Sequence, residues 1–268
     1  MPNSSSMRAS SPSADSITGL NRQPQVVIVV GGASGIGRAA AGLLLQRGAR
    51  VVCVDRNEAA VVRTSRELDP EARSVIPLVA DVTNPPSIRQ AVQATLDRWG
   101  YCHSLVNCAG ITGTTNIRSH EVELDDFDRV LAVNLRGALV VSKSILPVFV
   151  SQHYGRLLHI ASIAGKEGNA GMVSYSASKA GLIGMVKSMG KEYAQDGITV
   201  NALAPAVIRT DLVEMMPEEQ VNYMTTRIPM GRIGTLQEAA ELIAWIISPA
   251  ASFTTGFTFD LSGGRATY

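Results

Sequence analysis

The chain has 268 residues, of which 46% are hydrophobic and 18% are charged, and its formal net charge is +1. This length and composition are typical of one compact domain with a substantial core, and they exclude a chain that is disordered throughout. Because Lys and Arg form no basic block, we expect neither a nucleic acid nor an anionic membrane as a partner. The expected partner is a small-molecule substrate.

The N-terminal segment differs in composition from the rest of the chain. It is rich in Ser, has no apolar segment of the kind found in secretory signals, and resembles a transit peptide only weakly. We therefore expect a disordered leader over residues 1–24 and one folded domain over residues 25–268. Cys53, Cys102 and Cys108 form an odd set without metal-ligand spacing, which predicts free thiols, no metal site and a reducing, cytoplasmic location.

Within the expected domain, short runs rich in β-branched residues alternate with helical patterns. Pro85 opens one helix and Gly100 follows it, Gly48 follows another, and Thr235 and Glu238 form a capping box before a further helix. Strands that alternate with helices form right-handed crossovers, so we predict a doubly wound α/β domain with a seven-stranded parallel sheet. The predicted strands cover residues 26–30, 50–55, 74–80, 103–107, 156–161, 198–203 and 257–261.

The loop after the first predicted strand reads VGGASGIGRAAA over residues 30–41. Its glycines Gly31, Gly35 and Gly37 allow a tight turn and a close approach of the backbone to a pyrophosphate at a helix N-terminus. The next strand ends in Asp55, where a carboxylate can hold the ribose hydroxyls of an adenosine. A glycine turn with a chance Asp is the alternative, but the position in the first βα unit favours a dinucleotide site of the Rossmann type.

A second feature is YSASK at residues 175–179, set among small and aliphatic residues. On a helix, Tyr175 and Lys179 would lie on one face, about 6 Å apart along the axis. A cation near a phenol lowers its pKa, and the small neighbours leave room for a ligand against the helix. An exposed Tyr and Lys on an ordinary helix fit these five residues equally well, so other motifs have to decide between the two.

Those motifs resemble the classical short-chain dehydrogenase/reductase family, and the resemblance runs from about residue 25 to the C-terminus. The glycines follow the family's GxxxGxG spacing, and the chain departs from the family pattern only at Val30, Cys108 and Ala206. None of these departures removes a catalytic group. The other motifs are Asp81-Val82, NCAG at residues 107–110, Asn134 in VNLRG, and Ser162 placed 13 positions before Tyr175.

The resemblance implies an NAD(P)-dependent oxidoreductase that interconverts a secondary alcohol and a ketone. It gives Tyr175 the proton transfer with the substrate oxygen, and Lys179 the tasks of lowering the tyrosine pKa and binding the nicotinamide ribose. It also implies that Ser162 hydrogen-bonds the reacting oxygen and that Asn134 supports a water relay. A non-catalytic dinucleotide-binding sensor is the alternative, and the intact set of four residues argues against it.

The same resemblance predicts the cofactor site. Asp55 would repel a 2′-phosphate, which favours NAD. Arg56 is either a partner for such a phosphate or a solvated loop cation. The residues expected to contact the cofactor are Gly31, Ser34, Gly35, Ile36, Gly37, Asp55, Arg56, Asp81, Val82, Asn107, Ala109, Gly110, Tyr175, Lys179, Ile208 and Thr210.

The substrate is expected beside Ser162 and Tyr175, under a substrate lid formed by residues 206–230. Lys166, Arg209 and Arg265 are candidate partners for a carboxylate, although Lys166 is equally compatible with simple solvation. The stretches GKEGNAGMVSYSASK and FDLSGGRATY resemble the family's sugar-acid dehydrogenases, which oxidise a secondary hydroxyl of a 2-keto-3-deoxy acid. A 3-oxoacyl-carrier-protein reductase and a neutral polyol or ketone dehydrogenase are the alternatives. By family analogy we also expect a homotetramer paired through the helices near residues 134–153 and 175–195.

Overall fold

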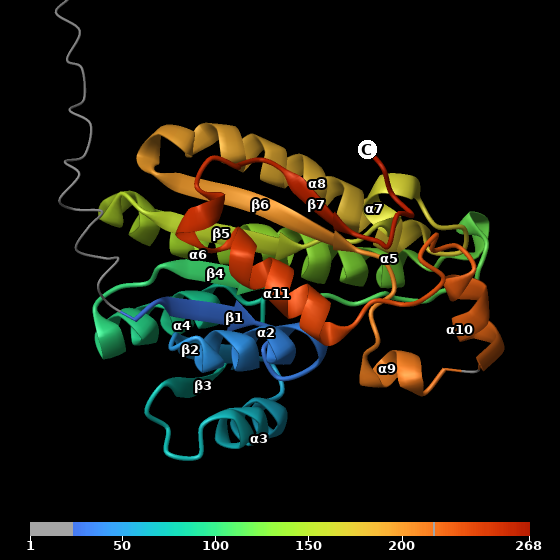
Figure 1. The fold of residues 1–268 in the computed structure, drawn as a ribbon. Helices are drawn as coiled ribbons and strands as arrows, with labels where there is room; N and C mark the ends of the chain where they lie inside the picture. The colour runs from blue at the N-terminus through green and yellow to red at the C-terminus, as the bar shows by residue number, and fades with distance from the viewer. Residues whose placement is uncertain (1–23, 217) are drawn as a thin grey trace, which may run out of the picture.

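A single parallel sheet forms the centre of the molecule (Figure 1), in a computed structural model that describes residues 24–216 and 218–268. The seven strands lie in the order β3-β2-β1-β4-β5-β6-β7, and every neighbouring pair is parallel. The doubly wound fold predicted from the sequence is therefore confirmed. The strands are β1 (Val26–Val30), β2 (Arg50–Asp55), β3 (Val75–Val79), β4 (Ser104–Asn107), β5 (Gly155–Ile160), β6 (Ile198–Pro205) and β7 (Thr258–Leu261).

Helices cover both faces of this sheet, which explains why its central strands read as continuous apolar runs. Along β1, Ile28 and Val30 belong to one hydrophobic cluster, and Val27 and Val29 to the other. The first cluster packs under α4 (Pro85–Trp99), α6 (Gly137–Gln152) and α8 (Val173–Glu192). The second packs under α2 (Gly35–Gln46), α3 (Glu58–Leu68) and α11 (Leu236–Ile246).

The helix ends follow the signals in the sequence. α4 begins at Pro85 and ends before Gly100, which has a φ of 79° that suits glycine. α11 begins with the predicted capping box, in which the Thr235 hydroxyl accepts the Glu238 N–H at 3.1 Å and the Glu238 carboxylate accepts the Thr235 N–H at 2.8 Å. The expected leader lies outside the described residues except for Pro24.

One helical run is unusually long and apolar. It joins α5 (Leu124–Leu131), a π-helical turn (Ala132–Arg136) and α6, and by length and mean hydropathy (1.4) it would pass for a membrane span. Half of its most apolar window is buried inside the fold, however, and Val141, Ile145 and Phe149 are completely buried in the first cluster. These contacts are those of a core helix.

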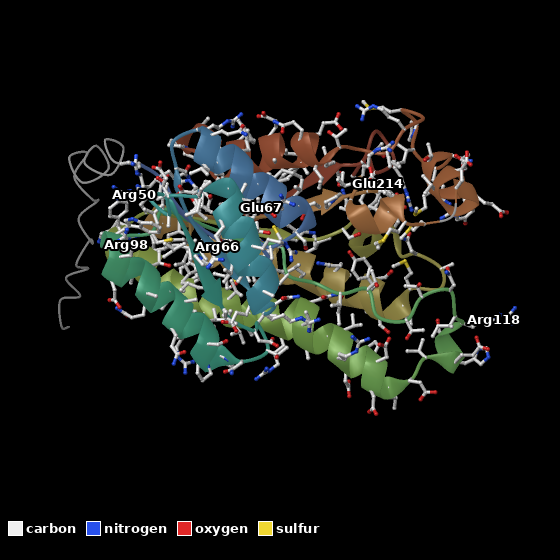
Figure 2. All side chains as sticks on the ribbon, turned by 90° about the horizontal axis from the view of Figure 1, so that it is seen from below. Arg50, Arg66, Glu67, Arg98, Arg118 and Glu214 are labelled. Atoms are coloured by element: carbon white, nitrogen blue, oxygen red, sulfur yellow. The ribbon has the colours of Figure 1, made fainter. Side chains whose placement is uncertain are left out.

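Short helices gather where the strands end. α7 (Ala164–Glu167) follows β5, and α9 (Asp211–Glu214) and α10 (Glu218–Thr225) follow β6 within the expected substrate lid (Figure 1). The labelled arginines of Figure 2 are dispersed, with Arg50 and Arg98 at one end of the molecule and Arg118 at the other. The short helices α7, α9 and α10 therefore follow the carboxyl ends of β5 and β6, at the edge of the sheet where ligands bind in folds of this kind.

Candidate active site

A cavity of about 300 Å³ opens at the carboxyl ends of the central strands. Its wall is built by the loops after β1, β2, β3 and β4, together with Ile160 of β5 and Thr210. Asn107, Tyr175, Lys179 and Ile208 are not part of this wall. Twelve of the residues expected to contact the cofactor do line it, namely Gly31, Ser34, Gly35, Ile36, Gly37, Asp55, Arg56, Asp81, Val82, Ala109, Gly110 and Thr210.

The glycine loop leaves no room for side chains where it turns. A Cβ on Gly37 would lie 2.1 Å from the Gly31 carbonyl oxygen, and a Cβ on Gly31, whose φ is 76°, would lie 2.9 Å from the Ala109 nitrogen. α2 starts at Gly35, so its first backbone N–H groups are directed toward the cavity entrance. This cradle fits a pyrophosphate, because the backbone can approach it closely and the helix N-terminus favours negative charge.

Asp55 is held at the rim of the cavity by backbone donors. Its Oδ1 accepts the Asn57 N–H at 3.0 Å, and its Oδ2 accepts the Ala33 N–H at a long 3.4 Å. Each carboxylate oxygen keeps lone pairs for the hydroxyls of a ribose. The side chain is therefore preset to act as an acceptor beside the glycine loop.

Asp81 lies on the same wall. Its Oδ1 accepts the Thr83 N–H at 2.8 Å and the Thr83 hydroxyl at 2.7 Å. The backbone hydrogen bond from Thr83 is the main cause that lowers the pKa of Asp81. Partial burial opposes this shift, whereas the Thr83 hydroxyl and the positive charge of Arg56 add to it. Arg56 therefore lies close enough to contribute to this shift, and both residues line the cavity.

Tyr175 and Lys179 share one face of α8, as predicted. The Lys179 Nζ lies 5.7 Å from the centre of the Tyr175 ring and donates a hydrogen bond of 2.7 Å to the Ile160 carbonyl. Burial lowers the pKa of Lys179 to about 8. Burial raises the pKa of the Tyr175 phenol, and a hydrogen bond with Ser162 acts in the opposite direction.

Asn134 sits in the π-helical turn and is almost completely buried. Its Nδ2 donates to the Ile111 carbonyl at 2.8 Å and to the Ser178 hydroxyl at 2.9 Å, while its Oδ1 accepts the Ile111 N–H at 2.8 Å. A Cβ on Gly110 would lie 3.3 Å from both the Asn134 Oδ1 and the Lys179 Nζ. The loop after β4 therefore passes tightly between these two side chains, and the four expected catalytic residues converge on one place.

Asn107 does not line the cavity. It is buried behind the cavity, where its Oδ1 accepts the Ala109 N–H at 3.2 Å and its Nδ2 lies 3.2 Å from His159 Nδ1. His159 Nε2 lies 3.0 Å from the Ser142 hydroxyl, which itself donates to the Ala138 carbonyl. His159 is therefore neutral with its proton on Nε2, and burial lowers its pKa to about 3.

Sequence reasoning did not single out His159 and Ser142. The one available signal was a histidine inside the apolar strand RLLHIA. Asn107 and His159 are register partners of β4 and β5, so the pairing of the two strands creates the contact. These residues hold the loop after β4 in place beneath the cavity.

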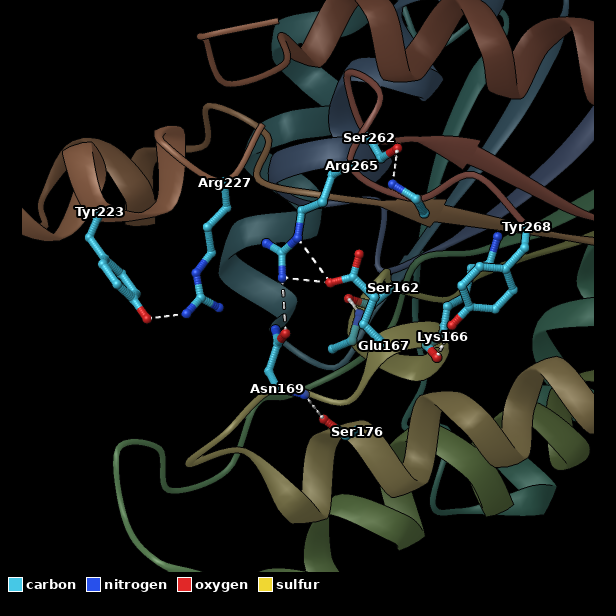
Figure 3. Close-up of polar contacts among 12 residues, drawn as sticks. Ser162, Lys166, Glu167, Asn169, Ser176, Tyr223, Arg227, Ser262, Arg265 and Tyr268 are labelled. Carbon is cyan, nitrogen blue, oxygen red and sulfur yellow. Dashed lines mark hydrogen bonds and ion pairs between the residues drawn. The ribbon is translucent and has the colours of Figure 1, made fainter. Parts of the chain in front are cut away.

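The three cations expected to bind a substrate carboxylate have unequal surroundings. The Lys166 Nζ is 2.7 Å from Asp260. The Arg265 guanidinium lies 2.9 Å from the Glu167 carboxylate, and this second pair can be followed in Figure 3. Arg209 is exposed and has no partner among the side chains that the structure describes. The structure therefore supplies partners for Lys166 and Arg265 and leaves Arg209 available.

Comparisons with known proteins identify the family of this chain. A family model described as enoyl-(acyl carrier protein) reductase matches residues 31–266. A 2-dehydro-3-deoxy-L-rhamnonate dehydrogenase (NAD(+)) of Sphingomonas sp. (strain SKA58) is 41% identical over 241 residues, which are 90% of this chain and 95% of the relative. The 3-oxoacyl-(acyl-carrier-protein) reductase FabG of Vibrio cholerae serotype O1 is 36% identical over 246 residues, which are 91% of this chain and 98% of that protein.

A solved structure shows the same fold. The crystal structure of gox2181 has a TM-score of 0.87 at 31% identity, with 91% of this chain and 96% of that chain covered. The chain therefore belongs to the short-chain dehydrogenase/reductase family, as its motifs predicted. It is an oxidoreductase that acts on CH–OH groups.

Proposed function

We propose that this enzyme uses NAD to interconvert the secondary hydroxyl of a 2-keto-3-deoxy sugar acid and the corresponding ketone. The observation that carries the choice of NAD is Asp55, whose carboxylate stands at the cavity rim with free lone pairs beside the glycine cradle. A 2′-phosphate at that place would meet a negative charge. The similarity to an NAD-dependent 2-dehydro-3-deoxy-L-rhamnonate dehydrogenase supports both the cofactor and the substrate class.

The chain's own residues divide the work of the reaction. NAD, when bound in the cavity, would supply the hydride-transfer chemistry. Tyr175 accepts the proton of the substrate hydroxyl in oxidation and returns it in reduction, while the Ser162 hydroxyl, which hydrogen-bonds the phenol, holds the reacting oxygen. Lys179 keeps a positive charge near the phenol because its pKa is about 8, and Asn134 fixes the turn of α8 beneath both residues.

Arg209 is our candidate for the carboxylate of the substrate. It follows β6, its backbone N–H is fixed by a 2.8 Å hydrogen bond to the Gly234 carbonyl, and its side chain is exposed. Lys166 and Arg265 are committed to Asp260 and Glu167, so either of them would have to leave an ion pair before it bound an anion. Arg209 has no ionic partner among the described side chains, and its guanidinium presents two parallel donors to a carboxylate, so it is the better candidate.

The test is a panel of 2-keto-3-deoxy sugar acids, neutral polyols and a 3-oxoacyl thioester, each assayed with both nicotinamide cofactors at the nicotinamide absorbance. We expect the highest kcat/KM for a sugar acid with NAD. The similarity to acyl-carrier-protein reductases makes the thioester the second candidate, and faster turnover of the thioester with NADPH than of any sugar acid would replace our proposal.

A homotetramer in the cytoplasm completes the proposal. The helices expected to pair between subunits expose Leu139 on α6 and Val173 on α8. Phe257 is also exposed directly before the edge strand β7, and its ring packs on Phe259, which in turn packs on Trp245 of α11. Burying such side chains in an interface removes apolar surface from water. Sedimentation equilibrium tests the assembly, and a monomer at micromolar concentration would contradict it.

A further inference from the structure

The C-terminal tail, residues 262–268, folds back onto the loop that follows Ser162 (Figure 3). This loop contains α7, the single helical turn that ends in Lys166 and Glu167. Both of these side chains are held by residues close to the C-terminus, although about 100 positions separate the partners in the sequence. The tail therefore clamps the loop that follows Ser162.

Arg265 makes the central contact of the clamp. Its Nε and Nη2 donate to the same oxygen of Glu167, at 3.0 and 2.9 Å, and Nη2 also donates to the Asn169 side-chain oxygen at 3.1 Å. The side chains of Arg265 and Glu167 are only 11% and 26% exposed. Charge-assisted hydrogen bonds shielded from water in this way are stronger than those of a fully exposed pair.

Lys166 provides a second anchor. Its Nζ lies between the Asp260 carboxylate, at 2.7 Å, and the Tyr268 ring, whose centre is 5.0 Å away. The Tyr268 hydroxyl donates to the Lys166 carbonyl at 2.6 Å. The end of α7 is thus held through both the side chain and the backbone carbonyl of Lys166.

The tail is itself fixed in position. The Ala266 N–H donates to the buried Ser262 hydroxyl at 3.1 Å, and the Gly263 carbonyl accepts the Met230 N–H at 3.1 Å. Gly263 has a φ of 59°, and a Cβ there would lie 2.6 Å from Ile228 Cγ2. The clamp is therefore seated against the end of the substrate lid and is not a loose terminus.

The clamped loop contacts the catalytic helix at two points. The Asn169 N–H donates to the Ser176 hydroxyl at 3.1 Å, one residue beyond Tyr175 on α8. At the start of α7, a Cβ on Gly165 would lie 2.6 Å from the Lys179 carbonyl carbon. A shift of this loop would therefore change how Ser162, at its beginning, faces Tyr175.

We propose that Arg265 is a positioning residue, which holds the loop of residues 164–169 through Glu167 and Asn169 and thereby sets the placement of Ser162 against Tyr175. This inference rests on the proposed roles of Ser162 and Tyr175 and not on the identity of the substrate. The guanidinium of Arg265 is already bound to Glu167 and Asn169. We therefore expect it to affect the turnover of every substrate equally, and not to bind the substrate carboxylate.

Kinetics of Arg265→Met, Glu167→Gln and the double variant test this role, with one acid and one neutral alcohol as substrates. We expect each single variant to lower kcat about tenfold for both substrates, because small misplacements of reacting groups are costly. The double variant should be no slower than the slower single variant, since both changes remove the same contact. Arg265→Lys should recover part of the loss. Arg47→Met, which breaks the distant and half-exposed pair with Glu241, is the matched control and should leave kcat unchanged.

If Arg265→Met raised KM for the acid substrate only, Arg265 would bind the substrate carboxylate and the proposal would be wrong. An unchanged kcat in both single variants would also overturn it. Hydrogen exchange of the full-length protein gives a readout that does not depend on turnover. Amides of residues 164–172 should exchange faster in Arg265→Met and Glu167→Gln but not in Arg47→Met, and equal exchange would contradict the clamp. If the wild-type enzyme oxidises no sugar acid, the proposed substrate fails while the exchange experiment still decides the role of Arg265.

Discussion

Removing the charge of Asp55 should relax the preference for NAD. Asp55→Asn keeps an oxygen that can accept the Asn57 N–H, now at 3.0 Å, so the loop after β2 should retain its shape. The variant loses one charge-assisted hydrogen bond to the adenosine ribose and the repulsion of a 2′-phosphate. A hydrogen bond to a charged group contributes about 1.5–3 kcal/mol, so NAD should bind roughly 10- to 100-fold more weakly.

The assay is the ratio of kcat/KM for NAD to kcat/KM for NADP, measured with one substrate. We expect the ratio to fall by at least about tenfold in Asp55→Asn, because a loss of about 1.5 kcal/mol corresponds to roughly a tenfold change in an equilibrium constant. Asp55→Ala should give the same fall in the ratio, together with a further loss for both cofactors because Asn57 and Ala33 lose their acceptor. An unchanged ratio in both variants would mean that Asp55 does not face the ribose.

Three further predictions follow from the site. Tyr175→Phe should bind NADH normally, as measured by fluorescence, and lose a factor of at least about 10² in kcat, the usual share of a general acid or base. The pKa of His159 is about 3 in the fold and 6.5 in the unfolded chain, so only the unfolded chain binds a proton on this residue between these pH values. The free energy of unfolding should therefore fall as the pH drops from 6.5 toward 3. Urea titrations should show that this free energy depends less on pH in His159→Asn. Gly37→Ala should abolish NADH binding, because its Cβ would lie 2.1 Å from a carbonyl oxygen, whereas Gly184→Ala, with nothing within 4 Å, should bind NADH like the wild type.

The sequence predicted the sheet well because its strands are buried on both faces. VVIVV of β1 has no polar position, and such a run has few alternatives to a central parallel strand. The glycine loop and the Tyr175–Lys179 face were predictable for a similar reason, since both depend on local geometry within one turn or helix. The seven strands lie within two residues of their predicted bounds.

Contacts between distant segments were not predictable. Asn107 was expected to contact the cofactor, but its side chain turns toward His159, and this contact depends on the register of β4 against β5. Lys166 and Arg265 were chosen for their charge and for their places in the loop after Ser162 and near the C-terminus. Their partners Asp260 and Glu167 lie about 100 positions away, so a pattern of residue types cannot reveal that these cations are already paired.

The raised pKa of Tyr175 bears on how this residue could act as a base in the proposed reaction. Lys179 is committed to the Ile160 carbonyl, and its own positive charge is disfavoured by burial, as its pKa of about 8 records. Ser162 stabilises the phenolate, yet burial outweighs this hydrogen bond. Burial therefore favours the protonated phenol, and a positive charge beside Tyr175 would shift the balance toward the phenolate. Oxidised NAD carries such a charge on its nicotinamide ring and NADH does not, so the same tyrosine is better suited to accept a proton in oxidation and to donate one in reduction.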